Sequence, residues 1–236
     1  MRCKIADLLV EIPEAGGMAP RCNGYLTDDK NAPDIAYSED LYDPSRWKDM
    51  PSKYGMYMDT GLFFYSKLLR FNGLMLHSSA VELDGKAYLF SGPSGIGKST
   101  HTALMCEAFP KARIFNDDKP ALRCLDGRWY AYGTPWCGKD GININLKAEL
   151  AGICFLRRGA KNSIRRLSPI EAASAVISQT LRRFSNSEAL GVMTELVNRL
   201  LETIPIYELI KLPNIEAAQL SYEAMSIGAR EIFNEN

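Results

Sequence analysis

The chain has 236 residues, 46% of them hydrophobic and 24% charged, which is enough for one large domain or for one domain with a small lobe. Its 28 basic residues balance its 28 acidic residues, so the composition gives no support for binding to nucleic acid or to an anionic membrane. No apolar run approaches the roughly 20 residues that span a bilayer. Six cysteines without a Cys-x-x-Cys pair predict free thiols in a reducing cytoplasm.

The N-terminal region differs in composition from the rest of the chain. It is rich in proline and in turn clusters, and it predicts only short strands, near residues 5–12 and 35–37. A helix is predicted next, over residues 57–71, because Leu62, Tyr65 and Leu68 fall at helical spacing and Asn72-Gly73 ends the pattern.

Residues 74–81 and 87–90 are apolar runs on either side of Asp84-Gly85, which predicts a β-hairpin. Further along, the patterns predict helices at 100–109, 169–184, 187–203 and 215–232, and strands at 113–115, 121–125, 129–132, 150–156 and 204–209. This mixture predicts an α/β fold. We expect a small N-terminal lobe over residues 1–72, of unclear role, and a catalytic phosphate-loop domain over residues 73–236.

A glycine-rich loop follows the second strand of the hairpin and precedes a helix. Its residues are Gly92, Pro93, Ser94, Gly95, Ile96, Gly97, Lys98, Ser99 and Thr100. Glycines of this Gly-x-x-x-x-Gly-Lys-Ser pattern allow positive φ and let successive N–H groups surround a phosphate. The lysine reaches the β- and γ-phosphates, and the serine hydroxyl binds Mg²⁺. The loop therefore predicts binding of a nucleoside triphosphate, ATP with Mg²⁺.

Two adjacent carboxylates, Asp117 and Asp118, close the short strand at residues 113–115, about 20 residues after Lys98. If that strand lies beside the loop strand, its carboxyl end is next to the γ-phosphate. One carboxylate can then organise Mg²⁺, and the other can accept a proton from an attacking hydroxyl. Adjacent like charges also tend to raise one pKa, which suits a base. A solvated turn capped by Asn116 is the alternative.

The block from Leu76 to Arg123 resembles the catalytic domain of bacterial HPr kinase/phosphorylase, whose fold is shared with phosphoenolpyruvate carboxykinase. The matching pieces are His77, the glycine loop and Asn116-Asp117-Asp118. The resemblance implies that His77 lies in the active site, that Lys98 and Ser99 bind phosphate and Mg²⁺, that Asp118 is the general base and that Asp117 lies beside the metal. It also implies a homo-oligomer. Without the resemblance, the favoured interpretation of His77 is a strand histidine that is hydrogen-bonded in the core.

Two other segments leave alternatives open. Residues 133–141 replace the glutamate-containing signature of that family, and Asp140 could substitute for its metal ligand. This segment is either a substrate or nucleotide loop, in which Trp136 stacks and Lys139 touches phosphate, or a plain structural loop. The cluster of Arg157, Arg158, Arg165 and Arg166 either binds phosphate or an acidic acceptor, or is a solvated face.

The sequence therefore predicts an ATP-dependent kinase of the HPr-kinase-like kind. The γ-phosphoryl group would pass to a hydroxyl acceptor, a serine of a protein or peptide, with Asp118, Asp117, Lys98 and His77 in the catalytic roles and Ser99 and Asp117 on the metal. The alternatives are a small-molecule kinase or carboxykinase-like enzyme on the same fold, and a non-catalytic nucleotide-binding regulatory module. The expected partners are the nucleotide and the acceptor, without nucleic acid or membrane, in the cytoplasm.

Overall fold

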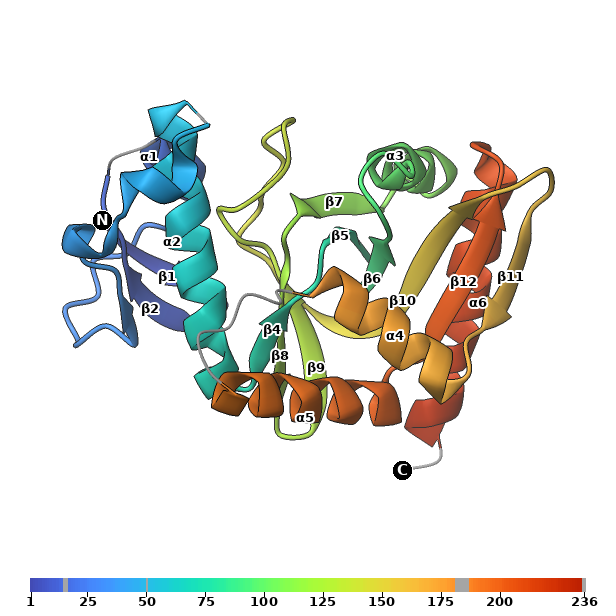
Figure 1. Cartoon of the computed structure of the whole chain (residues 1–236). Coiled ribbons are helices and arrows are strands. Elements are labelled where there is room, and N and C mark those ends of the chain that lie inside the picture. Colours follow the sequence, from blue (N-terminus) through green and yellow to red (C-terminus); the bar gives the residue numbers. More distant parts are fainter. Residues whose placement is uncertain (15–16, 50, 181–186, 235–236) are drawn as a thin grey trace.

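The computed structural model describes residues 1–14, 17–49, 51–180 and 187–234. In this part of the chain nine strands form one mixed sheet, and three short N-terminal strands form a separate one (Figure 1). Helices flank the large sheet, so the predicted α/β class with mixed sheets is confirmed. None of the described helices combines the length and the apolar character that crossing a bilayer requires.

The large sheet has the order β4-β8-β9-β10-β6-β5-β7, and β12 and β11 extend it from β10. Its strands are β4 (Gly73–Met75), β5 (Ser78–Leu83), β6 (Lys86–Ser91), β7 (Arg113–Asp118), β8 (Ala121–Leu125), β9 (Arg128–Tyr132), β10 (Lys147–Arg158), β11 (Ser163–Arg166) and β12 (Ile206–Lys211). The small sheet contains β1 (Arg2–Ile5), β2 (Leu8–Glu11) and β3 (Ile35–Ala36). The helices are α1 (Met18–Cys22), α2 (Ser52–Leu68), α3 (Lys98–Ala108), α4 (Pro169–Gln179), α5 (Ser187–Thr203) and α6 (Ile215–Asn234).

The central strands are buried on both faces, and their side chains alternate between two cores. In β6, Leu89 belongs to the core that contains Val176 of α4 and Leu196 of α5, whereas Phe90 belongs to the core that contains Met105 of α3 and Met225 of α6. This alternation follows from the two-residue period of a strand. Helices α3 and α6 therefore cover one face of the sheet, and α4 and α5 cover the other (Figure 1).

Most predicted elements are confirmed, including both hairpins centred on Asp-Gly and the helix at 57–71, which begins at Ser52. The strand predicted at 74–81 is interrupted, because Leu76 pairs with Thr180 and the His77 N–H donates to Gln179 at 2.8 Å. Strand β11, which pairs with β12, was not predicted. The helix predicted at 169–184 ends at Gln179, and residues 181–184 of that prediction lie outside the described residues.

The N-terminal strands and α2 share a hydrophobic core with the larger part of the chain. This core contains Ile5, Val10 and Phe64 from the N-terminal region together with Tyr132 and Trp136. In Figure 1, α2 lies between the small sheet and the large one. The predicted lobe at 1–72 is therefore continuous in its packing with the rest of the molecule.

Candidate active site

The loop between β6 and α3 has the backbone of an anion-binding turn. Gly92, Gly95 and Gly97 have φ angles of 142°, 79° and 97°, which side chains other than glycine rarely adopt. Helix α3 begins directly after Gly97 without a side-chain N-cap, so the N–H groups of its first turn are free to meet an anion. Ser99 and Thr100 in that turn are exposed.

The sheet brings the acidic pair level with the start of this loop. Ser78 of β5 pairs with Ser91 on one side and with Asp118 of β7 on the other. Both pairings are antiparallel, so β7 runs parallel to β6 and both strands end at the same edge of the sheet. The two strands are not direct neighbours, because β5 lies between them. The position beside β6 is occupied by β5, the first strand of the hairpin.

Asp117 faces the Ser99 hydroxyl at the start of α3. The Ser99 Oγ donates to the two carboxylate oxygens of Asp117 at 3.0 and 3.3 Å. Mg²⁺ prefers oxygen ligands and is commonly bound by one or two carboxylates together with phosphate oxygens and waters. This pair of oxygen donors fits such an ion. Among the described residues, no group of three or more His, Cys, Asp and Glu side chains is arranged for a metal.

Asp118 has different partners. The His77 Nε2 lies 3.0 Å from one of its carboxylate oxygens, and the Lys119 ammonium pairs with the other. The second ring nitrogen of His77, Nδ1, contacts Gln179 Oε1 at 3.1 Å, so the ring is held from both sides. The backbone of Asp118 has a φ of 121°, a strained value for a residue with a side chain, and strain of this kind is concentrated at functional sites.

The pKa of Asp118 is lowered, not raised as two adjacent carboxylates led us to expect. Burial would raise the pKa of this carboxyl, but the hydrogen bond from His77 and the charge and hydrogen bond of Lys119 outweigh it. The net result holds the Asp118 pKa well below its ordinary value of 3.8. Asp118 is therefore an ionised carboxylate at neutral pH.

Lys98 lies at the base of the loop, where its side chain is nearly buried. Its Nζ donates to the carbonyl oxygens of Gly92 and Pro93 at 3.0 and 3.4 Å. Burial lowers the Lys98 pKa, although the charges of Asp118 and Asp117 oppose that shift. The ammonium thus contacts the loop carbonyls and is within electrostatic reach of the acidic pair.

The segment at residues 133–141 supports the acidic pair rather than a nucleotide base. Trp136 is fully buried and stacks on Phe64 of α2 with ring centroids 4.8 Å apart, so its proposed stacking on a ligand is wrong. Cys137 pairs with Asp118 through the backbone, and the Gly138 N–H donates to the Asp117 carbonyl. Lys139 and Asp140 are exposed.

The arginine cluster is partly neutralised by carboxylates. Arg157 pairs with Glu208 at 2.5 Å, and Arg165 pairs with Glu208 and Glu171. Arg158 is the member that reaches the loop, where its Nη2 donates to the Gly95 carbonyl at 2.6 Å. A groove of about 740 Å³ extends from the start of the loop along this region to α4, and its lining includes Gly92, Pro93, Ile96, Arg157, Arg158, Arg165, Ser174 and Gln179.

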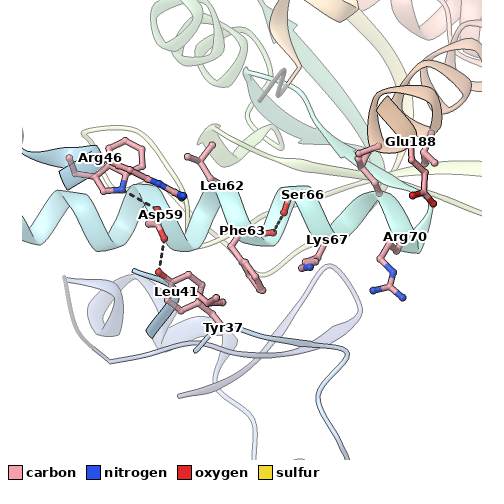
Figure 2. A pocket seen from close by; sticks show the side chains of 14 residues that line it. Tyr37, Leu41, Arg46, Asp59, Leu62, Phe63, Ser66, Lys67, Arg70 and Glu188 are labelled. Atoms are coloured by element: carbon pink, nitrogen blue, oxygen red, sulfur yellow. Dashed lines mark hydrogen bonds between the residues drawn. The ribbon is translucent and has the colours of Figure 1, made fainter. Parts of the chain in front are cut away.

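A second hollow, of about 790 Å³, lies along α2 and shares no lining residue with that groove (Figure 2). At one end of it the buried Asp59 carboxylate accepts hydrogen bonds from the Tyr37 hydroxyl at 2.6 Å and from the Trp47 Nε1 at 3.1 Å. Along the same helix Figure 2 shows the side chains of Phe63 and Lys67. The Asp59 hydrogen bonds fasten the N-terminal segment to α2, so this region completes the fold.

Three side chains at the site were missed by the sequence analysis. Lys119 follows the acidic pair directly, so adjacency alone could have suggested it. Gln179 and Lys211 come from α4 and β12, and the local sequence around them carries no signal for a phosphate site. Lys211 lies against the loop, with its Nζ 3.5 Å from the position that a Cβ on Gly97 would occupy.

Comparisons with known proteins give one family and a loose structural likeness. The model of a family described as "SynChlorMet cassette protein ScmC" matches residues 53–213, which include the loop, the acidic pair and Lys211. None of the curated proteins compared with the chain matches it. A solved structure, described as the Hpr(Ser) kinase/phosphatase from Coxiella burnetii, is 12% identical, with a TM-score of 0.36 over 69% of this chain and 99% of that chain.

Proposed function

The chain belongs to this ScmC family, and we propose that it is an ATP-dependent phosphotransferase of the HPr-kinase-like kind, with a hydroxyl group, such as a serine of a protein or peptide, as acceptor. The observation that carries the proposal is that two adjacent carboxylates have different contacts. Asp117 contacts the Ser99 hydroxyl of the loop, whereas Asp118 contacts His77 and Lys119. One carboxylate is thus suited to a metal and the other to the acceptor.

In this proposal the loop binds the triphosphate through its backbone N–H groups and the first turn of α3. When the nucleotide binds, the Lys98 ammonium gives up its hydrogen bonds to the loop carbonyls and donates to phosphate oxygens instead. Ser99 and Asp117 would hold Mg²⁺, which neutralises charge on the β- and γ-phosphates when bound. Each of these contacts positions the phosphoryl group for in-line transfer.

Asp118 is the proposed acceptor of the hydroxyl proton. The low pKa makes the Asp118 carboxylate a weak base, but the carboxylate is ionised at neutral pH and can therefore accept a proton. Phosphoryl transfer passes through a loose transition state, so a weak carboxylate base is sufficient. His77 and Lys119 are proposed to position the carboxylate, and the contact between His77 Nδ1 and the Gln179 side-chain amide holds the ring in turn.

The test is transfer from γ-labelled ATP by the purified protein to a lysate of its own source, with the Asp118→Asn variant beside it. We expect the variant to lose transfer by about 10²–10⁴-fold while ATP binding is nearly unchanged. Asp126→Asn, at an exposed turn between β8 and β9, is the matched control and keeps full transfer. Transfer at the wild-type rate in Asp118→Asn would overturn the role of Asp118.

One observation favours a second candidate, a nucleotide-binding regulatory module without catalysis. Both ion pairs of Asp118 are formed within the chain, and ion pairs of this kind also occur where they only stabilise the fold. This candidate predicts tight ATP binding by the wild-type protein with neither labelled product nor ADP release.

A further inference from the structure

The side of the phosphate loop away from the acidic pair carries two cations. Strands β10 and β12 pair in parallel, and their last residues, Arg158 and Lys211, are directly opposite each other. Arg158 donates to the Gly95 carbonyl at 2.6 Å, and the Lys211 Nζ lies 3.5 Å from the position of a Cβ on Gly97. The loop is therefore flanked by carboxylates from β7 on one side and by cations from β10 and β12 on the other.

Lys211 has a nearly buried side chain whose ammonium group lacks an acceptor within the described part of the chain. The residue is 5% exposed, and its Nζ has no hydrogen-bond or ion-pair partner among the residues that the structure describes. Burial, and then the charge of Arg158, lower the Lys211 pKa. The neighbouring His101, whose pKa burial and the Lys211 charge lower to about 3, is neutral and supplies no negative charge. An unpaired, partly desolvated cation beside the glycine loop is a favourable position for an anion from outside the chain.

We infer that Lys211 is a second lysine of the phosphate site and binds the diphosphate part of the nucleotide, the part that remains after transfer. The inference rests on the proposed function and extends it. During transfer the bond between the γ-phosphorus and the β–γ bridging oxygen breaks, and that oxygen keeps the electron pair. The acceptor oxygen forms the new bond to phosphorus, and its proton passes to Asp118. Lys211 neutralises the negative charge that the diphosphate gains.

The two flanks then orient the triphosphate. The γ-phosphoryl group lies toward Asp117 and Asp118, where the acceptor approaches, and the diphosphate lies toward Lys211. Arg158 has a supporting role, because its hydrogen bond to Gly95 ties the tip of the loop to β10. A cation placed where charge develops on the leaving group is among the strongest contributions to catalysis.

The experiment is calorimetric binding of ADP and of inorganic tripolyphosphate to the full chain and to Lys211→Met and Lys211→Arg. We expect Lys211→Met to lower the affinity for both ligands by about 10–100-fold, because one charge-assisted hydrogen bond is lost. Lys211→Arg is expected to keep most of the affinity. Lys161→Met, at an exposed lysine between β10 and β11, is the control and binds as the wild type does.

The thermal unfolding midpoint of the ligand-free protein separates this role from a structural one. Removing an unpaired, partly desolvated charge relieves a desolvation cost, so Lys211→Met is expected to leave the midpoint unchanged or to raise it. Wild-type affinity for ADP in Lys211→Met would overturn the inference while leaving the proposed function intact. A wild-type protein that binds neither ADP nor tripolyphosphate would overturn both.

Discussion

Asp118 shows how strongly the immediate neighbours of a residue decide its chemistry. An adjacent carboxylate alone would favour a raised pKa, whereas the hydrogen bond from His77 and the charge of Lys119 lower it despite burial. The carboxylate is thereby kept ionised and in one orientation. Its φ of 121° adds local strain, which the pairing with Cys137 helps to hold.

This lowered pKa makes a prediction about stability. Because the folded pKa lies below the unfolded value, the Asp118 contribution is fully present above the ordinary pKa of 3.8 and is lost as pH falls through the folded value. We expect Asp118→Asn to reduce the free energy of unfolding by about 1.5–3 kcal/mol at pH 7. The reduction should shrink below pH 4, as urea unfolding at several pH values would measure.

Asp126→Asn is the control for this pH series, because Asp126 is exposed, and its effect should stay within about 0.5 kcal/mol. A penalty for Asp118→Asn that is the same at pH 2 and pH 7 would contradict the assignment of the lowered pKa.

At the scale of elements, α2 depends on a close approach to Trp136. A Cβ on Gly61 would lie 2.9 Å from the Trp136 Cδ1, and the indole cannot move away because it is buried and stacked on Phe64. Glycine in a helix normally costs stability relative to alanine. Here the packing outweighs that propensity, since only glycine leaves room for the ring.

Two Gly→Ala substitutions in helices are therefore expected to have opposite signs. Gly61→Ala should destabilise the protein by about 1–3 kcal/mol, because it overpacks the contact with Trp136. Gly191→Ala in α5, where a Cβ would meet nothing within 4 Å, should stabilise it by about 0.5–1 kcal/mol. Urea unfolding measures both values, and a stabilising Gly61→Ala would show that the indole can be displaced.

The sequence predicts the helices and hairpins that are specified by neighbouring residues, but it does not predict the order of strands in the sheet. The turns at Asp84-Gly85 and Asp126-Gly127 are specified by two residues each, and both hairpins form as expected. The insertion of β5 between β6 and β7 has no such signal, because strand order is set by packing. The glycines and proline around Trp136 left a ligand-binding loop and a plain structural loop as alternatives, and only the structure shows that its ring fills the core beneath α2.

The same limit applies to the site. Ser99 and Asp117 could be placed together because the loop and the following strand are close in sequence, and the structure puts them 3.0 Å apart. Gln179 is 102 residues from His77, which it contacts, and Lys211 ends a strand that only the sheet brings to Gly97. Such contacts depend on the order of strands, which spacing along the chain cannot reveal.

At the scale of the whole molecule, the N-terminal region is tied to the acidic pair. Arg21 donates to the Cys137 Sγ at 2.7 Å, and Cys137 pairs in turn with Asp118. Arg123 donates to the Ala6 carbonyl at 2.6 Å, and the Tyr132 hydroxyl donates to Asp7 at 2.8 Å. These contacts, added to the shared hydrophobic core, lead us to propose that residues 1–72 and 73–236 fold as one cooperative unit.

The three tryptophans allow that proposal to be tested. Trp47 reports on the N-terminal region, through its hydrogen bond to Asp59, and Trp129 lies in the core beneath the large sheet. Two double variants each keep a single tryptophan. Trp129→Phe with Trp136→Phe keeps Trp47, and Trp47→Phe with Trp136→Phe keeps Trp129. In each variant we expect the fluorescence midpoint in urea to coincide with the far-UV circular dichroism midpoint, since one core links both reporters. An earlier fluorescence transition in the Trp47 variant alone would instead show that the N-terminal lobe unfolds by itself, and the shared core would then contribute little to cooperativity.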